Sequence, residues 1–185
     1  LVELAGWRGW GLSGIGGLLA ERALAAPTRA AILAPGRDAL DSGRLDALVA
    51  STVAELRARG IGRNDRVAIV VPNGPGMATA FLGVSAAATS APLNPSYRVD
   101  EFAFYLTDLD ATALVIAESL DSPAREVAVA RGIPVIELTP SGAAGAFTLS
   151  GGGGLTAGGN QDEGPAGDDD VALVLHTSGT TSRPK

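Results

Sequence analysis

The sequence predicts an α/β protein with a mostly parallel sheet and helices on its faces. Short apolar runs rich in β-branched residues alternate with longer stretches whose apolar residues recur at helical spacing. This alternation is typical of β–α–β units, and their right-handed crossovers place the helices on the faces of the sheet. A hydrophobic fraction of 46% over 185 residues is sufficient for a buried core of ordinary domain size.

The N-terminal region predicts two helices. Residues 18–26 place apolar side chains on one face, and this pattern ends before Pro27. Residues 44–59 repeat apolar side chains at the spacing of one helix face, with Ser42 as the expected N-cap. Gly60 follows as the expected stop of this second helix.

The central region predicts alternating strands and helices. Residues 66–71 read RVAIVV, which predicts a buried strand, and the turn-forming residues 72–74 close it. Pro75 is suited to open the next helix, whose inward stripe is expected to comprise Met77, Ala80, Phe81, Val84 and Ala88. A brief extended piece is expected at 89–93, and the alternation continues with expected strands at 113–117 and 133–138 and expected helices at 100–110 and 123–131.

Residues 141–170 interrupt this alternation with a composition rich in glycine and acidic residues. Glycine occupies positions 151–154 and 158–159, so the stretch predicts a flexible linker or a long surface loop. Its final acidic run, 168–170, predicts a solvated loop rather than a metal site, because Mg²⁺ needs converging ligands. The next residues, 171–175, read VALVL and predict a continuous apolar strand.

Composition and charge exclude several classes of function. A formal net charge of −6 argues against general binding to nucleic acids or anionic membranes. Because there is no cysteine, disulfides and thiolate or Cys-zinc chemistry are excluded, and the single histidine, His176, cannot build a His-rich metal site. Residues 9–20 have the apolar character of a secretory signal, but Glu21 interrupts it, so a cytoplasmic protein without a membrane span is expected.

Residues 176–185, HTSGTTSRPK, are the segment in which a specific chemistry is indicated. Small hydroxyl residues and a glycine follow His176, and backbone N–H groups and hydroxyls at such a loop suit phosphate oxygens. Lys185 adds a positive charge, and Arg183 is a second candidate cation. The loop is not a Walker A motif, because Pro184 stands where the second glycine must be. A polar Ser/Thr turn is the alternative interpretation.

This string resembles the phosphate loop of the adenylate-forming, AMP-binding enzymes, which include acyl-CoA synthetases, luciferases and peptide-synthetase adenylation domains. Their usual loop is an aromatic residue followed by T-S-G-T-T-G-x-P-K. Two upstream stretches, GIGRNDRVAIVVPNGP and AFLGVSAAATSAPLNPSYRVDEFAFYLTD, are similar to family segments in the same order, so the resemblance covers about residues 17–185. Ser182 replaces the usual glycine and His176 the aromatic residue, as in the oxalate–CoA ligase-like branch, which implies a small carboxylate substrate.

The resemblance implies the N-terminal part of the large domain of an ATP-dependent carboxylate–CoA ligase. Such enzymes join a carboxylate to the α-phosphate of Mg²⁺-bound ATP, releasing pyrophosphate, and coenzyme A then displaces AMP. The implied partners are a small carboxylic acid, ATP with Mg²⁺, and coenzyme A, in a setting such as fatty acid metabolism. The residues that the resemblance implies as phosphate contacts are Thr177, Ser178, Gly179, Thr180, Thr181, Ser182 and Lys185.

The expected organisation is one partial domain, residues 1–185. It divides into an N-terminal segment (1–16), the α/β unit, a Gly-rich loop (141–170), and a strand with the phosphate loop (171–185). Because the sequence starts without Met and stops inside the motif, a fragment without the C-terminal domain, and therefore inactive alone, is expected. No catalytic or metal-ligating residue is expected within it.

Two alternative functions stay open at the level of sequence. One is an adenylation domain that loads a carrier protein, and the other is a non-catalytic nucleotide-binding or interaction module. His176 is expected to pack at the end of the strand rather than to act as a general base, because no nucleophile or carboxylate is near it in the sequence.

Overall fold

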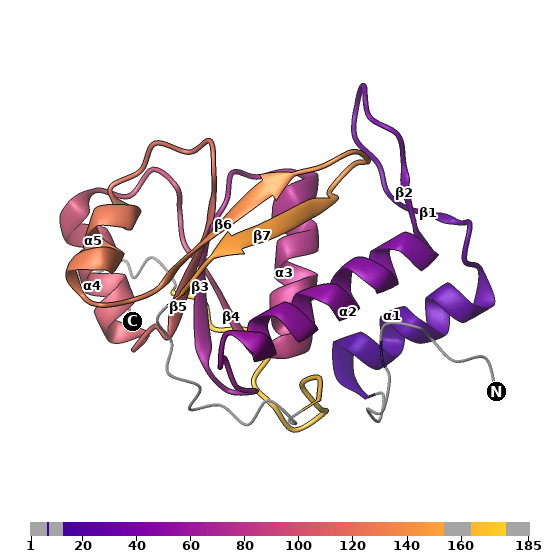
Figure 1. Cartoon of the computed structure of the whole chain (residues 1–185), viewed down its shortest axis with the longest axis horizontal. Helices are drawn as coiled ribbons and strands as arrows, with labels where there is room; N and C mark the ends of the chain where they lie inside the picture. The colour runs from indigo at the N-terminus through magenta and orange to yellow at the C-terminus, as the bar shows by residue number, and fades with distance from the viewer. Residues whose placement is uncertain (1–6, 8–12, 154–163, 177–185) are drawn as a thin grey trace.

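The computed structural model describes residues 7, 13–153 and 164–176, and it places a five-stranded sheet between two groups of helices (Figure 1). The strand order is β4-β3-β5-β6-β7, parallel except for β7, which runs antiparallel to β6. This confirms the predicted α/β fold with a mostly parallel sheet. The elements are α1 (Gly14–Ala25), β1 (Ala30–Ile32), β2 (Leu40–Asp41), α2 (Ser42–Ala58), β3 (Arg66–Val70), α3 (Pro75–Ala87), β4 (Thr89–Pro92), α4 (Val99–Asp108), β5 (Ala113–Ala117), α5 (Ala124–Ala130), β6 (Val135–Pro140) and β7 (Phe147–Gly151).

The central strands are buried on both faces, which explains their continuous apolar runs. Along β3, Val67 and Ile69 pack into the cluster formed with α1, α2 and α3, whereas Ala68 and Val70 pack into the cluster formed with α4 and α5. All five residues of β5 are buried in the same alternating way. The period of two along each strand therefore divides the side chains between two separate cores.

The second predicted helix begins two residues earlier than its apolar pattern indicated. Its N-cap is Asp41, whose carboxylate oxygen accepts a hydrogen bond from the Arg44 N–H at 2.8 Å, so the prediction of Ser42 as N-cap was wrong. The Ser42 hydroxyl instead donates to the Arg29 carbonyl at 3.1 Å. Gly60 follows the helix with a φ of +80°, as the predicted stop requires.

The stretch 141–170, predicted as a linker or surface loop, contains the strand β7, which its glycine-rich composition did not predict. β7 pairs antiparallel with β6 across five residue pairs and forms one end of the sheet. The preceding turn places Gly145 at a φ of +77° against α3, where its carbonyl accepts a hydrogen bond from the Thr79 hydroxyl at 2.6 Å. Residues 154–163 of the predicted linker lie outside the described residues.

The other predicted elements occur where expected, with small shifts at their ends. The strand expected at 113–117 matches β5 at both ends, whereas that expected at 133–138 begins after Pro134. On α3, Ala80 and Val84 are buried as the predicted stripe requires, and Met77 and Phe81 are half-buried at its edge.

A buried arginine joins the helices to the later part of the chain. The Arg57 guanidinium donates to the carbonyls of Ile61 and Ala87 at 2.5 Å each, and to that of Gly164 at 2.9 Å. These carbonyls come from the end of α2, the end of α3 and the segment that follows the described gap. One side chain therefore fixes three parts of the chain that are far apart in sequence.

The N-terminal tryptophan is also part of the core. Trp7 is 3% exposed, and its indole N–H donates to the Asp46 carboxylate at 2.9 Å. Burial raises the pKa of Asp46, and the hydrogen bond from Trp7 opposes that rise. The second tryptophan, Trp10, lies outside the described residues.

The contact between α2 and α3 leads to a testable prediction. A Cβ added at Gly83 would lie 2.9 Å from the Thr52 Cγ2, and Thr52 is held because its hydroxyl donates to the Leu48 carbonyl at 2.8 Å. We expect Gly83→Ala to lower the free energy of unfolding by about 1–3 kcal/mol, measured by denaturant titration. Gly76→Ala is the matched control, since its Cβ would meet no atom within 4 Å.

The control should raise stability by about 0.4–1 kcal/mol, because it removes conformational freedom from the unfolded chain. The double variant Thr52→Ala/Gly83→Ala should recover part of the loss caused by Gly83→Ala alone. Equal stability of Gly83→Ala and Gly76→Ala would contradict the close approach of the two helices.

Candidate functional site

The residues predicted to contact phosphate all lie outside the described residues: Thr177, Ser178, Gly179, Thr180, Thr181, Ser182 and Lys185. The structure does show how the chain approaches them. We refer to residues 164–176, which lead directly into the predicted loop, as the returning segment. It runs from the ends of α2 and α3, past the start of α1, to β4 and then to α4.

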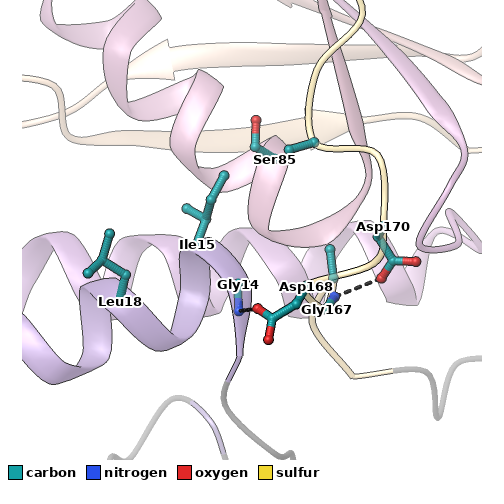
Figure 2. Close-up of a pocket in the computed structure, with 9 residues that line it drawn as sticks. Gly14, Ile15, Leu18, Ser85, Gly167, Asp168 and Asp170 are labelled. Carbon is teal, nitrogen blue, oxygen red and sulfur yellow. Dashed lines mark hydrogen bonds between the residues drawn. The ribbon is translucent and has the colours of Figure 1, made fainter.

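The first part of the returning segment contacts α1, α2 and α3. The Ala166 N–H donates to the Ala86 carbonyl at 2.8 Å, next to the Arg57 contact with Gly164. The Asp168 carboxylate then accepts a hydrogen bond from the Gly14 N–H at 2.7 Å (Figure 2). The N-cap residue of α1 makes no side-chain hydrogen bond to the helix. The Asp168 carboxylate instead accepts from one of the free N–H groups in the first turn of α1.

Asp170 is the most heavily hydrogen-bonded acid of the returning segment. Its carboxylate accepts from the N–H of Gly167 at 2.7 Å, from the Arg63 Nε at 2.6 Å and from the Asn64 amide at 3.0 Å. Burial raises its pKa, but the hydrogen bonds from Gly167, Arg63 and Asn64, together with the Arg63 charge, outweigh this and hold the pKa below its usual value.

The acidic run is exposed at Asp168 and Asp169, as the predicted solvated loop requires, whereas Asp170 is half-buried. The sequence did not reveal that Asp168 and Asp170 also join the returning segment to α1 and to the turn before β3. Within the described ranges, no three acidic or histidine side chains gather in a way that could hold a metal ion.

Two residues of β4 hold the next part of the returning segment. The Thr89 hydroxyl donates to the Val171 carbonyl at 2.7 Å. The Ser90 N–H donates to the Ala172 carbonyl at 3.0 Å, and the Ser90 carbonyl accepts from the Val174 N–H at 2.9 Å. The segment thus lies beside β4 and parallel to it.

The strand predicted at 171–175 is reduced to a single parallel bridge between Ser90 and Leu173. Its three hydrogen bonds to β4 are too few for a regular parallel ladder. Among the described residues, no further strand pairs with the opposite edge of the returning segment. The apolar side chains of Val171, Leu173 and Leu175 are 51%, 38% and 59% exposed, so no other described element covers this side of the segment.

His176, the last described residue, contacts α4. Its Nε2 lies 2.9 Å from the Asp108 Oδ2, and its ring packs edge-on against Tyr105 at 4.6 Å between centroids. The contact with Tyr105 agrees with the expected packing of His176 at the end of the segment. The sequence did not predict Asp108 as the carboxylate partner of His176. Asp108 is 68 positions away, and no pattern in a single sequence joins the two residues.

The ring that His176 contacts is itself part of an aromatic stack. Tyr97 lies parallel to Tyr105 at 4.8 Å and edge-on to Phe102 at 5.8 Å. Burial, followed by the hydrogen bond and charge interaction with Tyr105 and the charge of Glu101, raises the pKa of Tyr97 to about 12. Tyr97 is therefore uncharged at neutral pH.

A cavity of about 250 Å³ lies between α1, the end of α3 and the returning segment (Figure 2). The polar groups drawn at its rim are already engaged, since Asp168 accepts from Gly14 and Asp170 from Gly167. Its lining residues are Gly14, Ile15, Leu18, Ser85, Ala166, Gly167, Asp168, Asp170 and Ala172.

Comparison of the sequence with known protein families identifies the family of this chain. The family described as AMP-binding enzyme matches residues 19–185, which is most of the chain and includes both the sheet and the predicted phosphate loop. The chain belongs to the AMP-binding enzyme family. This confirms the resemblance to adenylate-forming enzymes that the loop and the two upstream stretches indicated.

Two relatives that this chain resembles are named CoA ligases. The oxalate–CoA ligase of Arabidopsis thaliana is 37% identical over 173 residues, which cover 92% of this chain and 34% of the relative. The probable CoA ligase CCL9 of Humulus lupulus is 37% identical over 174 residues, covering 91% of this chain and 33% of the relative. The chain thus spans about a third of the length of the curated relatives that it matches.

A solved structure supports the same assignment. The ATP-bound RpMatB-BxBclM chimera B3 superposes with a TM-score of 0.69 at 29% identity, covering 92% of this chain and 33% of that one.

Within the described part of the chain, no helix is both long and apolar enough to cross a bilayer.

The returning segment yields a prediction about pH. Because the folded-state pKa of Asp170 lies below the unfolded value, its contribution to stability is present above about pH 4 and is lost as the pH falls through the folded value. We expect Asp170→Asn to lower the free energy of unfolding by about 1–2 kcal/mol at pH 7. The difference from wild type should shrink as the pH falls toward 3.

Urea titrations of both proteins at a series of pH values measure this difference. Asp169→Asn, which changes the exposed neighbouring acid, is the matched control and should leave stability nearly unchanged at pH 7. A loss for Asp170→Asn that stayed constant down to pH 3 would show that the charge is not what stabilises the segment.

Proposed function

We propose that this chain is the N-terminal part of the large domain of an ATP-dependent carboxylate–CoA ligase. The reaction has two steps. A carboxylate oxygen bonds to the α-phosphorus of ATP as the bond to pyrophosphate breaks, which gives an acyl-adenylate. The thiol of coenzyme A then forms a thioester as AMP leaves. Family membership and the named CoA ligases among the relatives support this proposal.

One observation carries the proposal: the phosphate-loop string directly follows a segment that is docked on the edge of the parallel sheet. The hydroxyls of Thr177, Ser178, Thr180 and Thr181, the backbone of Gly179, the less usual Ser182 and the charge of Lys185 would contact the β- and γ-phosphates. Donors of this kind suit phosphate oxygens, because they place several N–H and O–H groups around one anion. Catalysis by such a loop consists of positioning and neutralising the leaving pyrophosphate.

ATP would enter this site as its magnesium complex. We assign no magnesium ligand, since the described residues hold no acidic cluster that fits one. The metal would neutralise phosphate charge, while the chain's own residues orient the phosphates through hydrogen bonds.

The acid is proposed to be a small carboxylate. Ser182 and His176 depart from the usual loop in the way that resembles the oxalate–CoA ligase branch, and an oxalate–CoA ligase is among the relatives at 37% identity.

Exchange of labelled pyrophosphate into ATP tests the proposal. A longer protein that contains this chain should catalyse exchange that depends on the acid, fastest with oxalate or another short dicarboxylate and slower with a long-chain fatty acid. The 185-residue chain by itself should show none. Exchange driven by an amino acid, followed by transfer to a carrier protein, would instead identify an adenylation domain. Tight nucleotide binding without any exchange would identify a non-catalytic module.

Substitutions in the loop give a second prediction. We expect Thr180→Val and Lys185→Ala each to reduce the exchange rate of the longer protein by about 100-fold, because each removes one group that stabilises the leaving pyrophosphate. Thr180→Ser keeps the hydroxyl and Lys185→Arg keeps the charge, so both should retain much more activity. If Thr180→Val and Thr180→Ser lost activity equally, the hydroxyl would not be the group that matters.

A further inference from the structure

We propose that His176 and Asp108 form a positioning pair that fixes the start of the phosphate loop to α4 and so raises the affinity for ATP. This inference rests on the proposed function of the loop. Neither residue is proposed to touch the reacting atoms. Their role is to hold the chain at the residue from which the loop departs.

The first support is the geometry of the pair. The His176 Nε2 lies 2.9 Å from the Asp108 Oδ2, within hydrogen-bond distance. The proposed pair has the His176 Nε2–H as donor and the Asp108 carboxylate as acceptor. The His176 side chain is 10% exposed and Asp108 is 55% exposed, so the histidine is packed while its partner reaches it from the surface.

The second support is the surroundings of the pair. Asp108 is the last residue of α4, where the negative end of the helix dipole disfavours a carboxylate and favours a donor or cation beside it. The His176 ring is also held edge-on against Tyr105, which is stacked on Tyr97. Two independent contacts therefore fix both the position and the orientation of the imidazole.

The consequence for the loop follows from chain connectivity. His176 is covalently joined to Thr177, the first predicted phosphate contact. Ordering backbone residues for phosphate binding costs conformational entropy, and part of that cost is removed when the residue before the loop is already fixed. Because the loop would hold the phosphates before and during the reaction, the pair should act mainly on the KM for ATP rather than on kcat.

A first experiment tests whether the pair exists in solution. His176 is the only histidine of the chain, so its imidazole gives a single set of signals in ¹H–¹⁵N spectra. We expect an observable Nε2-bound proton in the wild type, because the bond to Asp108 slows its exchange with water. Asp108→Ala should broaden that signal beyond detection, whereas Asp100→Ala, which changes an exposed acid on the same helix, should leave it unchanged.

A second experiment tests the positioning role by a double-mutant cycle in the longer protein. We expect Asp108→Ala and His176→Phe each to raise the KM for ATP in pyrophosphate exchange by about three- to fivefold. The double variant should be no worse than either single variant, because both remove the same bond. His176→Phe keeps an aromatic ring against Tyr105, so its effect isolates the hydrogen bond.

A rescue variant separates this role from simple packing. His176→Gln replaces the ring but keeps an N–H donor, so it should retain sensitivity to Asp108→Ala, which His176→Phe should lose. Additive effects in the cycle, an unchanged KM, or an Nε2 proton that survives Asp108→Ala would each overturn the inference. Absence of exchange in the wild type would overturn the proposed function and the positioning role with it, whereas exchange with additive variants would overturn the positioning role alone.

Discussion

The burial of Arg57 is the constraint on which the rest of the arrangement depends. A guanidinium in the core is tolerated only where acceptors surround it, and the carbonyls of Ile61, Ala87 and Gly164 meet that need. Ile61 follows the end of α2, Ala87 is the last residue of α3, and Gly164 starts the returning segment. The position from which the chain approaches the phosphate loop is therefore set by the same side chain that closes the helical layer.

From that point many polar contacts hold the returning segment. Asp168 and Asp170 bind backbone N–H groups and the Arg63 and Asn64 side chains, and Thr89 and Ser90 then bind its backbone. Directional bonds of this kind fix a path more narrowly than apolar packing does, because each has a limited range of distance and angle. Such a path suits a segment whose proposed task is to deliver a loop to one place.

The sequence predicted the alternating elements well because strands buried on both faces are strongly apolar, and the strand expected at 113–117 is β5 to the residue. β7 was not predicted, since its residues lie in a glycine-rich stretch and gain their strand conformation from pairing with β6. The family and the phosphate loop were recognisable from a local string, whereas the His176–Asp108 pair, the contact of Arg57 with Gly164 and the bond between Asp170 and Arg63 were not. Each of these joins residues far apart in sequence, which periodicity and motif spacing do not reveal.

The bond between Gly14 and Asp168 has a consequence for how the chain is made. It joins residues 154 positions apart, so the first turn of α1 gains its carboxylate only after nearly the whole described chain has left the ribosome. The elements between them, with their shorter crossovers, can assemble earlier, because closing a small loop costs less entropy than closing a large one. Synthesis therefore favours an order in which the sheet forms around β3 and β5 first, and the bond between Gly14 and Asp168 forms later.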